Sequence, residues 1–186
     1  MSDFERLVYA SRATFPAARE GSGVEIEVGR ILVQSRRNNP RIGLVGALYY
    51  ADGCFFQCLE GSSASLDTVY TRIALDPRHT NLKMLRRESI PALQYADWAM
   101  KHAAGGAQVQ ALLTRTGRRD FDPYSFDEAM ISDMLQILRV GVDARLPEPA
   151  PAPAAPANDP RVSSAILVAG LALVVSVVAL VVALGT

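Results

Sequence analysis

The run FFQCLEG, which begins at Phe55, carries one glutamine among apolar residues. If this run is a β-strand, Phe55, Gln57 and Leu59 share a face, and the amide of Gln57 enters an apolar layer. A buried primary amide needs partners for two donors and one acceptor. Either the protein core supplies them or a polar, planar ligand does, and the pattern alone leaves both readings open. Tyr9, in an earlier apolar run, could reach the same layer.

The other reactive residues are less informative. Asp76 and His79, in the run DPRH, could form an acid–base pair, but such a run also commonly ends a helix. Arg12 alone makes a weak phosphate loop, and the sequence has no GxGxxG, P-loop, GxSxG or HExxH motif. Cys54 and Cys58 cannot form a disulfide framework. With only two histidines there is also no zinc-ligand set of the usual spacing.

Charge and length narrow the class of protein. The 186 residues predict one domain of ordinary size with an appendage. The 19 basic and 19 acidic residues balance, so no overall field attracts nucleic acid, and we expect no nucleic-acid partner.

Periodicity predicts the elements that must position these side chains. Ser22 followed by Glu25 fits a capping box at the start of a helix, and Pro40 ends that helix at residues 38–39. Asp52-Gly53 between two apolar runs predicts a hairpin. In chain order we expect strand 3–11, helix 22–39, strands 41–50 and 54–60, helix 64–75, strands 83–90 and 98–102, and a helix within 122–138.

This order, β-α-β-β-α-β-β followed by a helix, predicts an α+β fold. It is close to a ferredoxin-like sandwich with an antiparallel or mixed sheet. Residues 105–146 hold about one helix pair, and Ile131, Met134, Leu135 and Leu138 form an apolar stripe there.

The C-terminal part has a different composition. Residues 165–184 are apolar except for Gly170 and Ser176, and twenty helical residues span about 30 Å of bilayer. The segment before them is proline-rich and predicts an extended spacer. We therefore expect a soluble domain at 1–104, helices at 105–146, a linker at 147–162 and a transmembrane helix at 163–185. Arg161 favours a C-terminal anchor with the preceding domain in the cytoplasm.

Six short runs carry a family resemblance. They are LVYAS at 7–11, SRRNNP at 35–40, GLVGALYY at 43–50, FFQCLEG at 55–61, RIALDPRH at 72–79 and DWAM at 97–100. Together they resemble the BLUF domain, a flavin-binding blue-light sensor, over residues 4–103. The resemblance implies FAD between two helices on one face of the sheet. It implies a photoactive Tyr9, with Gln57 between it and the flavin, and Trp98 and Met100 placed near the glutamine. It also implies flavin contacts from Ser35, Asn38, Asn39, Arg72, Asp76 and His79.

The residue chemistry agrees with that role. An excited flavin is a strong oxidant, and a phenol can give up an electron and then its proton. A glutamine amide can rotate or tautomerise, which reverses its hydrogen bonds. The resemblance therefore implies a light sensor without enzymatic activity of its own, whose output passes to an unidentified protein or through a homo-oligomer.

Three alternatives remain at this stage. A flavin-dependent oxidoreductase would need a substrate opening beside the flavin. A thiol-adduct photosensor would use Cys54, although that residue should face away from Gln57. A ferredoxin-like adaptor without a ligand is the third.

Overall fold

The computed structural model describes residues 4–16, 25–103 and 106–141. All of them belong to the unit Met1–Pro147, and the unit Glu148–Thr186 lies outside the described residues. The described strands are β1 (Phe4–Ala13), β2 (Val45–Ala51), β3 (Cys54–Gly61), β4 (His79–Ile90) and β5 (Lys101–His102). The helices are α1 (Ile26–Asn38), α2 (Ser63–Ala74), α3 (Gly106–Arg115) and α4 (Glu128–Val140), with short 3₁₀ helices η1 (Asn39–Ile42) and η2 (Pro123–Ser125).

The strands form one mixed sheet in the order β4-β1-β3-β2-β5. The pairs β1–β4, β1–β3 and β2–β3 are antiparallel, and β5 runs parallel to β2. Every residue of β3 is buried, as its apolar run predicts for a central strand. The element order confirms the predicted α+β arrangement.

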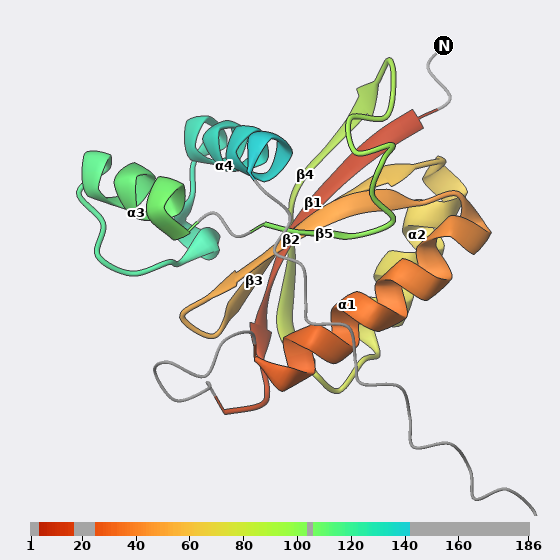
Figure 1. Cartoon of the computed structure of the whole chain (residues 1–186), viewed down its shortest axis with the longest axis horizontal. Coiled ribbons are helices and arrows are strands. Elements are labelled where there is room, and N and C mark those ends of the chain that lie inside the picture. The colour runs from red at the N-terminus through yellow and green to blue at the C-terminus, as the bar shows by residue number, and fades with distance from the viewer. Residues whose placement is uncertain (1–3, 17–24, 104–105, 142–186) are drawn as a thin grey trace, which may run out of the picture. The chain divides into compact units, whose positions relative to one another are not determined.

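Helices cover both faces of the sheet (Figure 1). One face packs against α1 and α2 through Leu7, Tyr9, Phe55 and Leu59, and we call this layer the α1/α2 core. The opposite face packs against α3 and α4 in what we call the α3/α4 core. The apolar stripe predicted within 122–138 is buried in this α3/α4 core, so α4 packs its apolar side against the sheet.

The hairpin between β2 and β3 forms as predicted. Asp52 and Gly53 both have positive φ, 50° and 70°, which is the backbone of the primed turns that match strand twist. The capping box was wrong: α1 begins at Ile26 after Glu25, whose side chain makes no capping hydrogen bond, while Ser22 lies outside the described residues. The predicted end of α1 is confirmed, with Asn39 as its C-cap.

Three predicted strands had wrong limits. The strand predicted at 41–50 begins at Val45, because Asn39–Ile42 forms the 3₁₀ helix η1. β4 begins at His79 rather than residue 83, because an edge strand carries mostly polar residues and shows little alternation. The strand predicted at 98–102 is reduced to Lys101–His102. The carbonyl of Trp98 accepts from Gly46 of β2, but side chains bind the next two: Asn39 donates to Ala99 and Arg36 to Met100.

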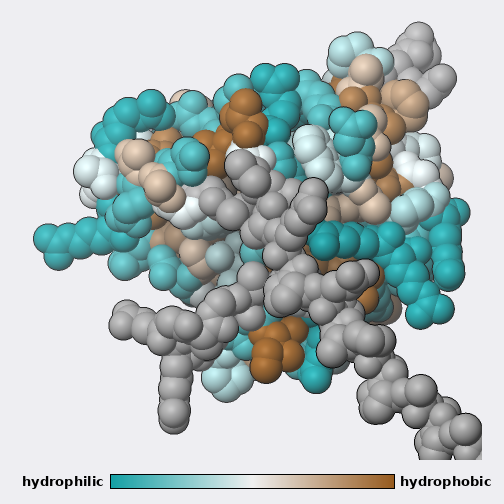
Figure 2. All heavy atoms as spheres, viewed as in Figure 1, coloured by the Kyte–Doolittle hydropathy of each residue, from teal (hydrophilic) through white to brown (hydrophobic). Residues whose placement is uncertain are grey.

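The linker 147–162 and the span predicted at 163–185 lie outside the described residues. Within the residues that are described, no helix is long and apolar enough to cross a membrane. On the face of the molecule that Figure 2 shows, the hydrophobic residues that are visible form only small groups between hydrophilic ones. Most large apolar side chains of the described domain are instead inside its two cores.

Candidate functional site: a cleft between α1 and α2

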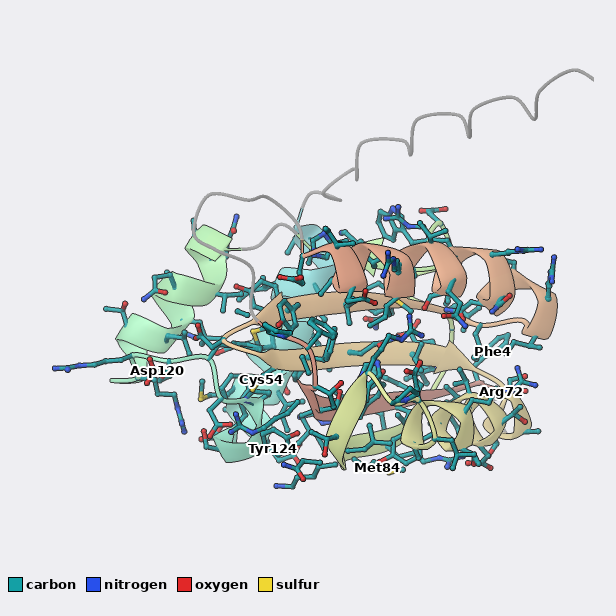
Figure 3. All side chains as sticks on the ribbon, turned by 90° about the horizontal axis from the view of Figure 1, so that it is seen from below. Phe4, Cys54, Arg72, Met84, Asp120 and Tyr124 are labelled. Atoms are coloured by element: carbon teal, nitrogen blue, oxygen red, sulfur yellow. The ribbon has the colours of Figure 1, made fainter. Side chains whose placement is uncertain are left out.

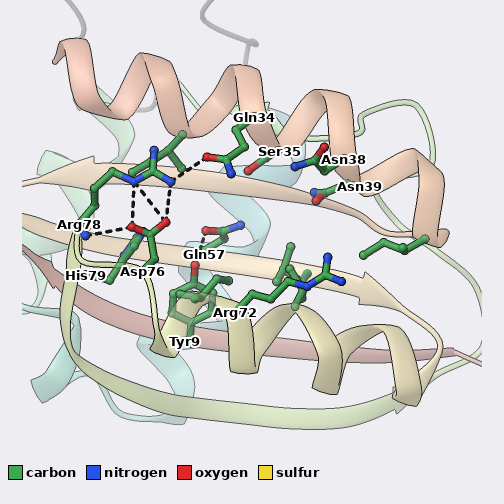
Figure 4. Close-up of a pocket in the computed structure, with 15 residues that line it drawn as sticks. Tyr9, Gln34, Ser35, Asn38, Asn39, Gln57, Arg72, Asp76, Arg78 and His79 are labelled. Atoms are coloured by element: carbon green, nitrogen blue, oxygen red, sulfur yellow. Dashed lines mark hydrogen bonds and ion pairs between the residues drawn. The ribbon is translucent and has the colours of Figure 1, made fainter.

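A cleft opens between α1 and α2 above the sheet (Figure 4). The cavity it encloses is about 150 Å³ and opens to solvent. Its floor is made of sheet residues and its walls of helix residues. The lining residues include Tyr9, Gln57, Ser35, Asn38, Asn39, Arg72, Asp76 and His79.

Tyr9 and Gln57 form the centre of the floor. The Tyr9 hydroxyl donates to Oε1 of Gln57 at 2.5 Å, and both side chains are buried. Burial raises the pKa of the Tyr9 phenol far above its ordinary value, so the group stays protonated and remains a donor. This arrangement confirms the prediction that the two residues reach one layer.

The other arm of the Gln57 amide contacts Met100. Nε2 donates to the Met100 sulfur at 3.7 Å, and a thioether is a weak acceptor. A primary amide has a second N–H, and the buried Gln57 lines the cleft. A planar ligand with hydrogen-bonding groups in the cleft would therefore supply a better partner than the sulfur does.

Asn39 joins the cleft wall to the segment before β5. Its side chain is only 3% exposed, and Nδ2 donates to the carbonyl of Ala99 at 2.9 Å. Arg36 donates from Nε to the carbonyl of Met100, also at 2.9 Å. Side chains at the end of α1 thus hold the backbone of Ala99 and Met100 in place.

A charged group closes one end of the cleft. Arg78 donates to both carboxylate oxygens of Asp76 and, through Nη2, to Gln34 of α1 at 2.8 Å. The hydrogen bond from Arg78 keeps the pKa of Asp76 below its usual value. Sequence reasoning missed Gln34 and Arg78. Arg78 lies inside the run RIALDPRH, so its adjacency to Asp76 was the available signal, whereas Gln34 had none.

His79 lies between the cleft and the sheet. Its Nδ1 is 2.8 Å from the Ser11 hydroxyl, and its ring is 4.6 Å from that of Phe55, centroid to centroid. Burial lowers the pKa of His79 to about 4, so the ring is neutral near pH 7. A neutral imidazole adds no charge to the cleft, which leaves Arg72, Asp76 and Arg78 as its charged side chains.

The donor set fits a flavin. The side chains of Asn38 and Arg72 are exposed at the cleft and make no hydrogen bond or ion pair with other described residues. With Ser35 and the Gln57 amide they offer donors and acceptors above apolar walls formed by Ile31, Val69 and Ile73. These are the groups that a flat heterocycle with a polar edge and a phosphate-bearing chain requires.

Three residues of interest lie outside the cleft, at the α3/α4 core. Trp98 does not line the cleft but packs against the α3/α4 core, so only Met100 of that pair lies beside Gln57. Cys54 and Cys58 point to the same α3/α4 core, as predicted. Figure 3 shows Cys54 well away from Arg72 of the cleft.

Fold and site together define a small-molecule-binding α+β domain with a buried tyrosine–glutamine pair at the base of its cleft. The family model for BLUF, sensors of blue-light using FAD, matches residues 4–101, and the chain belongs to this family.

Relatives and solved structures agree with that assignment. The chain is 31% identical over 103 residues to photoactivated adenylate cyclase subunit beta of Euglena longa, covering 55% of this chain. It is 33% identical over 100 residues to the Euglena gracilis subunit beta, covering 54% of this chain. In each case the chain spans only 11% of the relative's length. The photo-activated state of BlsA is similar with a TM-score of 0.68 and 28% identity, covering 77% of this chain and 99% of that one. The dark-state structure of the BLUF protein BlrB has a TM-score of 0.55 and 26% identity, covering 74% and 97%.

Proposed function

We propose that this chain is a blue-light sensor that binds FAD noncovalently in the cleft between α1 and α2. The observation that carries the proposal is the buried hydrogen bond from Tyr9 to Gln57 at the base of that cleft. Ser35, Asn38, Asn39, Arg72, Asp76 and His79 are the side chains that would hold the flavin. When bound, the flavin supplies light absorption and, once excited, oxidising power.

Gln57 acts as a hydrogen-bond switch. In its present orientation the amide accepts from Tyr9 and donates to the Met100 sulfur. If the amide reverses, Nε2 faces the tyrosine oxygen and Oε1 faces the sulfur, which has no proton to donate. The reversed amide thus loses its hydrogen bond to Met100. Reversal of the Gln57 amide beside the flavin therefore changes the contacts of the segment that carries Met100.

The signal passes to a partner protein rather than to a catalytic domain of this chain. The support is that the Euglena longa and Euglena gracilis cyclase subunits match this chain over 103 and 100 residues, only 11% of each subunit. In this chain α3 and α4 follow the sensing region. We assign residues 1–104 to sensing and 105–146 to output, and a homo-oligomer is the second route for that output. The partner itself stays unidentified.

The other flavin chemistries have less support. Cys54 and Gln57 point to opposite faces of the sheet, so a thiol adduct at Cys54 would require β3 to turn over. A flavin oxidoreductase would need a proton- or hydride-handling group beside the ring. The cleft histidine, His79, is bonded to Ser11 and has a pKa of about 4.

We further propose that the sensor is tethered to a membrane by residues 163–185, with 147–162 as a spacer and the sensor on the cytoplasmic side. The support is the sequence alone: a long uncharged apolar run behind a proline-rich segment.

Purification with its bound chromophore tests the central proposal. The protein should carry FAD that denaturation releases intact, and blue light should shift its absorption slightly to the red, with recovery in the dark. A protein that binds no flavin, or binds it without any light response, would refute the proposal.

A further inference from the structure

Met100 and Lys101 are consecutive residues whose side chains enter opposite layers of the domain. Met100 belongs to the α1/α2 core and receives the hydrogen bond from Gln57. Lys101 is only 1% exposed, and its Nζ donates at 2.9 Å to the carbonyl of Arg139, in the last turn of α4. One peptide unit therefore connects the photoactive glutamine to the helix layer on the other side of the sheet.

The groups around Lys101 stabilise its buried ammonium. Burial of an ammonium is costly unless the charge finds compensating groups. The last turn of α4 supplies one, because the unsatisfied carbonyls at a helix C-terminus carry partial negative charge. Trp98 supplies another, with its ring centroid 4.2 Å from Nζ. Lys101 thus binds the segment that carries Trp98 and Met100 to the end of α4.

The backbone around Lys101 leaves little room to absorb a change at Met100. Lys101 pairs with Ala47 in the parallel ladder between β2 and β5. On either side, Gly46 donates to the Trp98 carbonyl and Ala103 donates to that of Leu48. A rearrangement of the Met100 side chain is therefore taken up within 98–101, the segment to which the Lys101 ammonium is attached.

We propose that Lys101 is the positioning residue that transmits the rearrangement at Gln57 and Met100 to the last turn of α4. This inference rests on the proposed light-sensing function. It assigns to one buried lysine the coupling between the two helix layers.

Hydrogen exchange of the full-length, flavin-loaded protein tests this role. In the wild type, light should change the exchange of the Val140 and Gly141 amides, in the turn where the Gly141 N–H bonds to Ile137. Lys101→Met keeps the chain length but removes the ammonium, so dark-state exchange there should be roughly two- to fivefold faster and the light–dark difference should disappear. Lys101→Arg should restore the difference.

Lys83→Met is the matched control. Lys83 also donates to a backbone carbonyl, that of Tyr124, but it lies on β4 and is exposed. That variant should retain the light–dark difference at α4.

The outcomes separate this inference from the proposed function. Two results would overturn the role of Lys101 while leaving the proposed function in place. The first is a wild type that shows the spectral shift but no light–dark difference in exchange at α4. The second is a Lys101→Met variant that shows the spectral shift and keeps that difference unchanged. A wild type without the spectral shift would overturn the proposed function, and this inference with it.

Discussion

Tyr9 of β1 lies directly opposite Gln57 of β3 in the antiparallel register of the two central strands. Side chains of such pairs project from the same face, which brings the hydroxyl and the amide into contact without any loop. The pair is therefore positioned by the most buried part of the sheet. Such rigid support suits a switch in which only the amide should move.

Tyr9→Phe should leave flavin bound but abolish the light-induced shift. The ring and its packing remain, while the ionisable hydroxyl is lost. The buried Gln57 oxygen also loses its donor, which should lower the free energy of unfolding by about 1–3 kcal/mol. Absorption spectra before and after blue light measure the effect. Tyr70→Phe is the control, because the Tyr70 ring packs 5.9 Å from that of Tyr9 and should keep the shift when changed.

Gln57→Leu should likewise retain flavin and lose the shift. Leucine keeps approximate volume but has no amide to reverse, and the Met100 sulfur loses its donor. The comparison variant is Gln34→Leu, which changes an exposed glutamine at the rim of the same cleft. A Gln57→Leu protein with a normal shift would exclude the amide switch even though flavin is bound.

Asn39→Ala should weaken flavin binding or alter the resting spectrum, and should also destabilise the fold. Removing the buried amide leaves the Ala99 carbonyl without its donor, which should lower the free energy of unfolding by about 1–3 kcal/mol. Asn38→Ala, at the exposed neighbouring position, should lower it by less than about 0.5 kcal/mol. Chemical denaturation of both variants checks the difference, and equal losses would contradict it.

Stability should fall as the pH is lowered from about 6.5 toward 4. The pKa of His79 is depressed in the folded state to about 4, so the unfolded chain binds more protons in this window and its population rises. The loss between pH 7 and pH 5 should be about 2 kcal/mol at most. His79→Gln, which can still bond to Ser11, should flatten this part of the profile. Asp76, with a lowered pKa, contributes only at still lower pH.

The full-length chain should fractionate with membranes, and a chain ending at Arg145 should be soluble without detergent. The reason is the uncharged run at 165–184 behind the proline-rich segment. Recovery of the full-length protein in the soluble fraction would contradict the proposed anchor.

Much of this site could be predicted from the sequence because strand alternation places residues reliably. Phe55, Gln57 and Leu59 share a face, and Cys54 and Cys58 take the other, as the period of two requires. The Asp52-Gly53 turn was equally clear, since positive φ at both positions favours these residue types.

Other parts depend on tertiary contacts that no local pattern encodes. The carbonyls of Ala99 and Met100 are bound by the side chains of Asn39 and Arg36 rather than by a continuous ladder, so the predicted strand was too long. Trp98 lies with its ring centroid 4.2 Å from the ammonium of the buried Lys101, a contact that no local pattern predicts. The bond from Arg78 to Gln34 joins residues 44 positions apart, a separation that periodicity cannot reveal.

The most direct test of the account is a light-minus-dark absorption spectrum of the purified, flavin-loaded protein. We expect a small red shift of the flavin bands that reverses in the dark and is absent from both Tyr9→Phe and Gln57→Leu. A normal shift in both variants would contradict the tyrosine–glutamine mechanism. A bleached, near-ultraviolet photoproduct that disappears in Cys54→Ala would contradict it as well, and would establish thiol-adduct chemistry in its place.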